Sequence, residues 1–167
     1  MRTSTVALAA LGLALAGCGQ GGSSSGSAQT AAAPTQAPPA LAPAQVKALV
    51  ASLPAPYNTG DPEAGKAVFA QCAACHTTAE GGPSMTGPNL YGVFGRKAGS
   101  TGGFAYSDAL KASGWTWDAA RIDQWITNPR AMLPTTKMTF AGLPDPKARN
   151  DVIAYLKTQT SPAPPSS

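Results

Sequence analysis

At 167 residues, the chain has room for one ordinary domain with extensions, but not for two full domains. Its formal charge is +4, and residues 60–160 carry ten basic and eight acidic side chains, hence +2. This charge is too small and too scattered to indicate a nucleic-acid-binding protein.

The amino terminus has the features of a targeting segment. Arg2 is followed by an apolar run over 6–16, which is too short to span a bilayer, so we expect a signal peptide over 1–17. Residues 15–18, Leu-Ala-Gly-Cys, resemble the lipobox of bacterial lipoproteins. They predict that Cys18 is lipidated and begins a mature chain anchored to a membrane in the bacterial periplasm. Ordinary cleavage after Ala16 is the alternative, but it would leave a lone cysteine in a secreted chain.

The segment that follows predicts a linker. Residues 18–59 are rich in Pro, Ala, Gly and Ser, cannot bury much apolar surface, and are expected to be flexible. Within them, Val46, Leu49, Val50 and Leu53 recur at helical spacing, so a short helix resting on the domain is the alternative for that part. A disordered tail is expected over 161–167.

Residues 60–160 predict an all-α domain. Asp61 and Asp145 each precede a proline, as at a capped helix start, and predict helices to about Cys72 and Lys157. Further helices are predicted over 118–127 and, shorter, over 106–113. The remaining stretches, 77–104 and 128–144, are expected to be loops. Loops of this length usually serve a function or wrap a bound group.

The segment Cys72-Ala73-Ala74-Cys75-His76 predicts that bound group. C-x-x-C-H is the haem c attachment motif, in which two thiols form thioethers with the porphyrin and the next residue offers an imidazole to iron. A zinc site is the first alternative, but the chain has no other histidine and, outside the motif, only Cys18 as a further cysteine. A thioredoxin-like redox pair is the second, but the βαβ pattern expected beside it is missing.

The domain resembles a class I cytochrome c of the mitochondrial-like branch, here in the form of a bacterial membrane-anchored lipoprotein. The resemblance covers nearly all of residues 60–160. The residues that carry it are Gly65, Phe69, the runs 87–99 and 103–109, Trp117, Asn128-Pro129, and the runs 134–142 and 153–156.

This resemblance implies a small all-α fold of three to five helices, with long ordered loops wrapped around one covalently bound haem c. It implies His76 and Met138 as the iron ligands. The chain also has Met85 and Met132 in this domain, but only Met138 lies in the Thr-Lys-Met-x-Phe context of the family. The cofactor-binding set implied is Cys72, Cys75, His76, Pro88, Arg96, Tyr106, Trp117, Thr136, Met138 and Phe140. The Pro88 carbonyl would orient His76, and Arg96, Tyr106 and Trp117 would lie near the haem propionates.

The function implied is single-electron transfer, not enzymatic catalysis, because two axial protein ligands leave iron no open position. The partners implied are a quinol–cytochrome c reductase and a terminal oxidase or other periplasmic redox complex of a respiratory or photosynthetic chain, with the protein itself a monomer. The alternatives are a peroxidase-like haem enzyme or small-ligand sensor with a labile distal Met138, and an assembly lipoprotein that exchanges thiols.

Three departures from the family pattern stand out. Trp125 occupies a position where the family often has a tyrosine near the methionine sulfur, so the sequence leaves open whether it bonds Met138. Leu110 stands where an asparagine commonly helps to order a water molecule. Most of the lysines that ring the haem edge in mitochondrial relatives are missing, and residues such as Gln71 and Met85 replace them.

Overall fold

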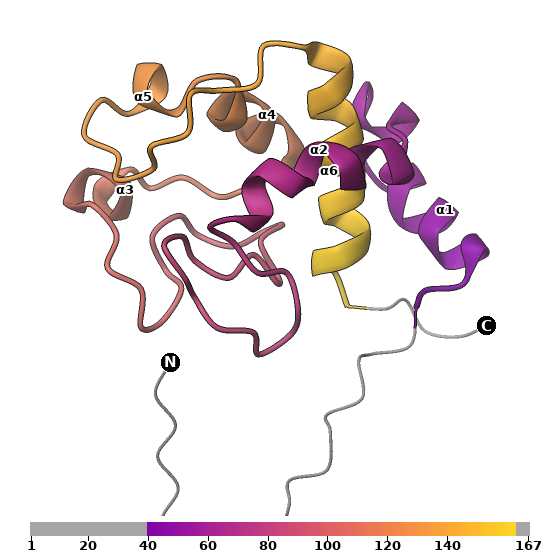
Figure 1. Ribbon diagram of the computed structural model, residues 1–167, viewed down its shortest axis with the longest axis horizontal. Helices are drawn as coiled ribbons and strands as arrows, with labels where there is room; N and C mark the ends of the chain where they lie inside the picture. Colours follow the sequence, from indigo (N-terminus) through magenta and orange to yellow (C-terminus); the bar gives the residue numbers. More distant parts are fainter. Residues whose placement is uncertain (1–39, 163–167) are drawn as a thin grey trace, which may run out of the picture. The chain divides into compact units, whose positions relative to one another are not determined.

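The computed structural model describes residues 40–162, which form a helical domain. The elements are α1 (Pro43–Ala51), the 3₁₀ helix η1 (Tyr57–Thr59), α2 (Pro62–Ala73), α3 (Asp108–Ala112), α4 (Ala119–Thr127), α5 (Pro129–Met132) and α6 (Pro146–Thr160) (Figure 1). Within residues 40–162 there is no β-strand, and the nearest approach to one is an isolated bridge between Lys97 and Thr116. The predicted all-α class is confirmed.

Side-chain caps start the predicted helices. The Asp61 carboxylate accepts hydrogen bonds from the backbone N–H groups of Glu63 and Ala64, and Asp145 accepts one from Lys147. Both caps precede a proline at the first helical position, whose missing N–H costs nothing there. The helix α5 lies in a stretch expected to be loop, and Asn128 caps it by accepting from Ala131 N–H. This four-residue helix is too short to produce a periodic sequence signal.

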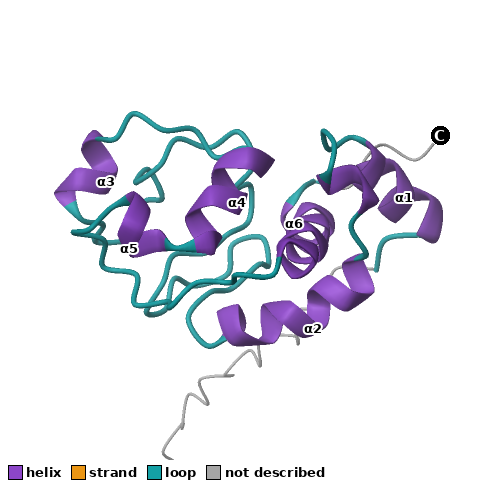
Figure 2. Ribbon diagram, turned by 90° about the horizontal axis from the view of Figure 1, so that it is seen from above, coloured by secondary structure: helices purple, strands orange, loops and turns teal. Residues whose placement is uncertain are grey.

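Helices α2 and α6 cross in close contact although they lie far apart in the sequence (Figures 1 and 2). Gly65 makes this approach possible, because a Cβ atom there would lie 2.8 Å from Cβ of Tyr155. One turn further along α2, the ring of Phe69 meets that of Tyr155 with centroids 5.2 Å apart. Gly65, Phe69 and Tyr155 therefore form the contact at which the two helices cross.

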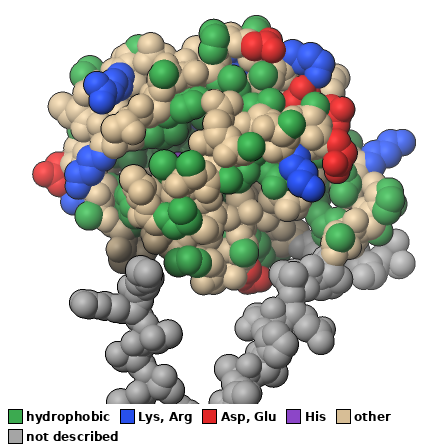
Figure 3. All heavy atoms as spheres, viewed as in Figure 1, with side chains coloured by type: hydrophobic (Ala, Val, Ile, Leu, Met, Phe, Trp, Pro, Cys, Tyr) green, Lys and Arg blue, Asp and Glu red, His purple; other side chains and the backbone are tan. Residues whose placement is uncertain are grey.

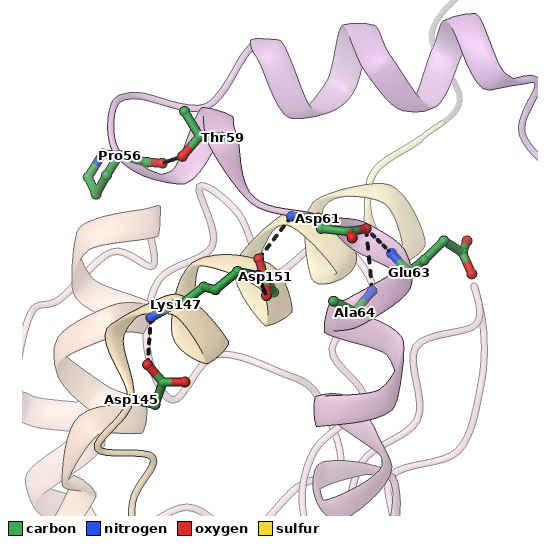
Figure 4. Close-up of polar contacts among 8 residues, drawn as sticks. All are labelled: Pro56, Thr59, Asp61, Glu63, Ala64, Asp145, Lys147 and Asp151. Atoms are coloured by element: carbon green, nitrogen blue, oxygen red, sulfur yellow. Dashed lines mark hydrogen bonds and ion pairs between the residues drawn. The ribbon is translucent and has the colours of Figure 1, made fainter.

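Uncharged and hydrophobic side chains cover most of the face drawn in Figure 3, and charged side chains are few there. One carboxylate is buried: Asp151 of α6 is only 4 % exposed. It accepts a hydrogen bond from the backbone N–H of Asp61 (3.0 Å) and another from Lys147 Nζ (2.6 Å) (Figure 4). The buried charge is thus paired, and it ties the start of α2 to α6.

The folded part of the chain begins before Gly60. Helix α1 and η1 pack on α6 and bury Val50, Leu53 and Tyr57. Residues 43–59 therefore differ from the flexible linker expected over 18–59, and the alternative of a short helix packed on the domain holds for this part. A nine-residue helix gains its stability from such packing, since its intrinsic propensity alone is insufficient.

The signal peptide predicted over 1–17, the lipidation of Cys18, the first part of the predicted linker and nearly all of the predicted tail lie outside the described residues. None of the helices within residues 40–162 is both long enough and apolar enough to cross a bilayer.

Candidate haem-binding site

A cavity of about 360 Å³ opens among α2, α4, α6 and the long loops, and its walls are mostly apolar. All ten residues predicted to bind the cofactor line it: Cys72, Cys75, His76, Pro88, Arg96, Tyr106, Trp117, Thr136, Met138 and Phe140. The structure thus brings together side chains from four separate stretches of sequence, whereas Cys18 lies outside the described residues.

The two cysteines and the histidine lie at the carboxyl end of α2. The backbone N–H groups of Cys75 and His76 both donate to the carbonyl of Cys72, each at 3.0 Å, and this tight turn keeps the three side chains at the cavity. The two cysteines are not joined by a disulfide. Burial, and secondarily Cys75, raises the pKa of Cys72 to about 11. Thiol exchange needs a thiolate, so this environment disfavours the thioredoxin-like and thiol-exchange alternatives.

His76 is held in one orientation by the following loop. Its Nδ1 lies 2.8 Å from the carbonyl oxygen of Pro88, and because a carbonyl can only accept, Nδ1 carries the proton of this bond. Burial lowers the pKa of His76, an effect that the bond to Pro88 partly opposes. The neutral ring therefore keeps the lone pair on Nε2 available, as a metal-ligating imidazole requires.

Gly87 lets the loop approach this ring closely. A Cβ atom at Gly87 would lie 2.7 Å from Nδ1 and 2.8 Å from Nε2 of His76, closer than side-chain atoms tolerate. Gly87 was not among the residues predicted to bind the cofactor. Its place directly before Pro88 was the only signal in the sequence, since glycine often marks a close approach of the backbone.

Met138 is oriented by a tryptophan. The indole Nε1–H of Trp125 donates to the Met138 sulfur at 3.1 Å, so the bond that the sequence left open is present. Trp125 is 8 % exposed and packs edge-on against Trp115 and Trp117, with ring centroids 6.2 and 5.6 Å away. A buried indole held in this way has little freedom to turn its N–H elsewhere. Both predicted ligands are thus fixed by a hydrogen bond before any metal is considered.

The polar part of the cavity lies around Arg96. Its guanidinium donates to the carbonyls of Tyr91 (2.8 Å) and Asn89 (3.1 Å), and burial lowers its pKa. Within residues 40–162, no hydrogen bond uses the Tyr106 hydroxyl or the Trp117 indole N–H, although both side chains line the cavity. These donors are available to anionic groups of a bound molecule.

Several apolar wall residues lie outside the predicted cofactor-binding set. Val152 and Leu156 face the cavity, whereas Ala154, on the opposite side of α6, meets the backbone at Gly60. Leu110 also lines the cavity, and it adds an apolar group where the family commonly has an asparagine. Periodicity identifies such residues as buried, but it cannot distinguish contact with a cofactor from contact with protein.

These observations fit a haem. The cavity offers an imidazole and a thioether for iron, two thiols for covalent attachment, apolar walls for the ring, and unused donors for the propionates. Cys72, Cys75, His76 and Met138 are the residues that would hold it. Among residues 40–162, no three His, Cys, Asp or Glu side chains are grouped so that they could hold a metal ion.

The chain is similar to proteins of one family. The family model described as cytochrome c matches residues 62–160. The cytochrome c2 of Rhodoblastus acidophilus is 54% identical over 97 residues, 58% of this chain and 91% of the relative. The cytochrome c2 of Rhodomicrobium vannielii is 51% identical over 112 residues, covering 67% and 89%. The cytochrome c of Kluyveromyces lactis is 42% identical over 105 residues, covering 62% and 96%.

Proposed function

The chain belongs to the cytochrome c family, and from this membership we propose that it is a single-electron carrier with one haem c ligated by His76 and Met138. The family binds haem c covalently, and Cys72 and Cys75 stand in the spacing that this attachment requires. Its relatives are named as cytochromes c and c2, which are electron carriers rather than enzymes.

The observation that carries the proposal is that His76 and Met138 line one cavity and are each oriented by a hydrogen bond. The haem, when bound, supplies the reversible one-electron chemistry. The protein's residues hold the ring and limit its contact with water. Rigid ligands of this kind also limit the rearrangement that accompanies each gain or loss of an electron. The Pro88 carbonyl accepts the hydrogen bond from Nδ1–H. This makes Nε2 of His76 a better electron donor to a metal ion.

Met138 determines which oxidation state of the iron the site favours. A thioether is a soft ligand that favours the reduced metal, so ligation by His76 and Met138 implies a high reduction potential. The hydrogen bond from Trp125 occupies part of the sulfur electron density and strengthens this preference. It also holds Met138 in place, which argues against the alternative of a peroxidase-like enzyme or sensor with a labile distal methionine.

The proposal is tested first by covalency and spectra. We expect the haem to stay with the polypeptide through denaturation and acid–organic extraction, and the ferric protein to show the weak near-red band of a sulfur–iron bond. Met138→Ala should abolish that band and open the site to carbon monoxide in the ferrous protein. Met132→Ala and Met85→Ala are the matched controls, and loss of the band in either of these would refute the assignment of Met138.

We also propose that the protein is anchored in the bacterial periplasm by a lipid on Cys18. The support is the sequence over residues 1–18, since these lie outside the described residues. Two or more acyl chains give stable attachment. Mass spectrometry of membrane-extracted protein should find a lipidated Cys18 as the first residue. Soluble protein that begins at Gly17 would disprove the anchor.

The proposed partners are a quinol–cytochrome c reductase as donor and a terminal oxidase or another periplasmic redox complex as acceptor. The support is membership of the family together with the proposed location. Purified protein should be reduced by the reductase in the presence of a quinol and reoxidised by the oxidase. A reductase that reduces Met138→Ala as fast as the parent protein would count against this role.

A further inference from the structure

The loop that carries Met138 is attached to the helices at both of its ends. At its start, the N–H of Leu133 donates to the carbonyl of Pro129 at 2.9 Å. At its end, the N–H of Leu143 donates to the carbonyl of Ile126 in α4 at 2.8 Å. Between these ends, Met138 is held through the Thr136 hydroxyl, which accepts from its backbone N–H, and through Trp125. The position of the sulfur therefore depends on how firmly the loop is attached.

Arg149 of α6 makes the strongest attachment at the carboxyl-terminal end of the loop that carries Met138. Its Nη1 donates to the carbonyls of both Leu143 (2.9 Å) and Pro144 (2.8 Å). These are charge-assisted bonds, which are stronger than bonds between neutral groups. The planar guanidinium directs its donors along fixed lines, so it specifies the position of the loop as well as stabilising it.

Asp123 of α4 fixes the guanidinium. Arg149 Nε lies 2.7 Å from Asp123 Oδ1, and the two side chains are only 12 % and 23 % exposed. Asp123 is two residues from Trp125, whose indole bonds the Met138 sulfur. The ion pair between Arg149 and Asp123 thus joins α6 and the end of the loop to α4, the helix whose Trp125 orients Met138.

The segment that precedes the family match lies close to this pair. Tyr57 of η1 is 8 % exposed, and η1 packs against α6. Burial is the largest cause that raises the pKa of Tyr57; Asp123 raises it further and Arg149 lowers it, so the phenol lies within electrostatic range of both partners. Since Arg149 and Asp123 are themselves largely buried, their ion pair is screened less than a surface pair would be.

We propose that Arg149, held by Asp123, is a positioning residue for Met138, and that it limits transient opening of residues 133–144 at the iron. The inference rests on the proposed ligation of iron by Met138. Local opening of a loop occurs with a smaller free energy than unfolding of the whole domain, so the two can be measured separately. Weakening the ion pair should increase opening of the loop much more than unfolding of the helices.

The test compares Arg149→Lys and Asp123→Asn with the parent protein in its full-length, haem-loaded form. Arg149→Lys keeps the charge but removes the planar fork, and Asp123→Asn keeps the shape but removes the charge. The readout is the rate at which potassium cyanide displaces Met138 in the ferric protein, followed by loss of the near-red band. We expect at least about a tenfold faster rate in each variant, because the bonds lost are charge-assisted.

Lys147→Gln is the matched control, since it breaks another ion pair of α6 that does not contact the loop. It should leave the cyanide rate within about twofold of the parent. The melting temperature of the helices is measured in parallel by far-ultraviolet circular dichroism. Unchanged cyanide rates in Arg149→Lys and Asp123→Asn, or a rate increase matched by Lys147→Gln, would overturn the positioning role. A parent protein without the near-red band would instead refute ligation by Met138, and this inference with it.

Discussion

Gly87 is the residue at which the smallest substitution should disturb the site most. A Cβ atom there would lie 2.7 Å from Nδ1 of His76, so Gly87→Ala should push the ring off the Pro88 carbonyl. Overpacking of this kind costs about 1–3 kcal/mol. We expect a lower melting temperature together with a weakened low-spin visible spectrum, both measured on the haem-loaded protein.

Gly102→Ala is the control for that substitution. A Cβ atom at Gly102 would meet no atom within 4 Å, so this variant should keep the parent's melting temperature and spectrum. Equal behaviour of the two variants would show that contact with His76 is not what requires glycine at position 87.

Trp125 should influence the reduction potential through its hydrogen bond. The indole N–H withdraws electron density from the Met138 sulfur, which disfavours the oxidised state. Trp125→Phe removes this donor, and a bond worth about 1 kcal/mol corresponds to a decrease of roughly 40 mV for a one-electron couple. A spectroelectrochemical titration measures the shift.

Trp115→Phe provides the comparison for Trp125→Phe. Trp115 belongs to the same cluster of three rings but makes no hydrogen bond to Met138, so its replacement should change the potential by much less. A shift in Trp115→Phe as large as that in Trp125→Phe would mean that packing of the cluster, and not the N–H donor, sets the potential.

The residues of the site differ in how well a sequence can reveal them. Cys72, Cys75 and His76 are adjacent in the chain, so their spacing alone carries the chemistry. Met138 was assigned from the context of its loop. The bond from Trp125 to Met138 could not be predicted, because it depends on how α4 and the loop pack and on the direction of one side chain. The close approach of Gly87 to His76 could not be predicted for the same reason.

At the scale of elements, the crossing of α2 and α6 should be the most sensitive contact. Gly65→Ala would place a methyl group 2.8 Å from Cβ of Tyr155 and against the backbone of Asp151, forcing the helices apart. We expect a loss of about 1–3 kcal/mol in the free energy of unfolding, measured by urea titration. Alanine is the better helix former, so the intrinsic preference of α2 acts in the opposite direction.

Ala70→Ser, on the exposed side of the same helix, serves as the reference variant and should change stability by less than about 0.5 kcal/mol. A Gly65→Ala variant as stable as the parent would show that the two helices can separate slightly at no cost.

Helices with strong start signals were predicted well, and those that depend on tertiary contacts were not. Asp61 and Asp145 cap α2 and α6 at the predicted positions. Helix α1 was weighed only as an alternative, because its stability comes from burying Val50 against the domain, and the pattern of a short apolar stripe does not show whether a partner surface exists. Helix α5 has four residues and one cap, too little for a pattern.

At the scale of the whole molecule, the charge of residues 60–160 is only +2, and two haem propionates would nearly cancel it. Long-range steering toward an acidic partner should therefore be weak. With a Cys18→Ser protein, which would lack the proposed lipid anchor, the rate of electron exchange with a purified partner complex should change with ionic strength by well under the tenfold or more that steering produces.

A double variant, Gln71→Lys with Met85→Lys, restores positive charge beside the cavity and should make that dependence steeper. Gln71 is exposed beside the cavity, and Met85 is 46% exposed, so both positions can accept a charged side chain. A steep salt dependence in the parent protein would contradict the prediction. It would mean that the partner recognises a local arrangement of charges that the net charge of +2 does not reveal.

The pairing of α2 with α6 also orders the events by which the protein matures. Ribosomes make the chain from its amino terminus, so Cys72, Cys75 and His76 emerge well before Pro146–Thr160, the helix on which α2 packs. Until then α2 is a twelve-residue helix without a partner, which is marginal in water. Before α6 packs on it, the segment that carries the two thiols would be largely unfolded and open to haem attachment. We therefore expect haem to be bonded to the chain before α6 packs on α2 and closes the fold around it.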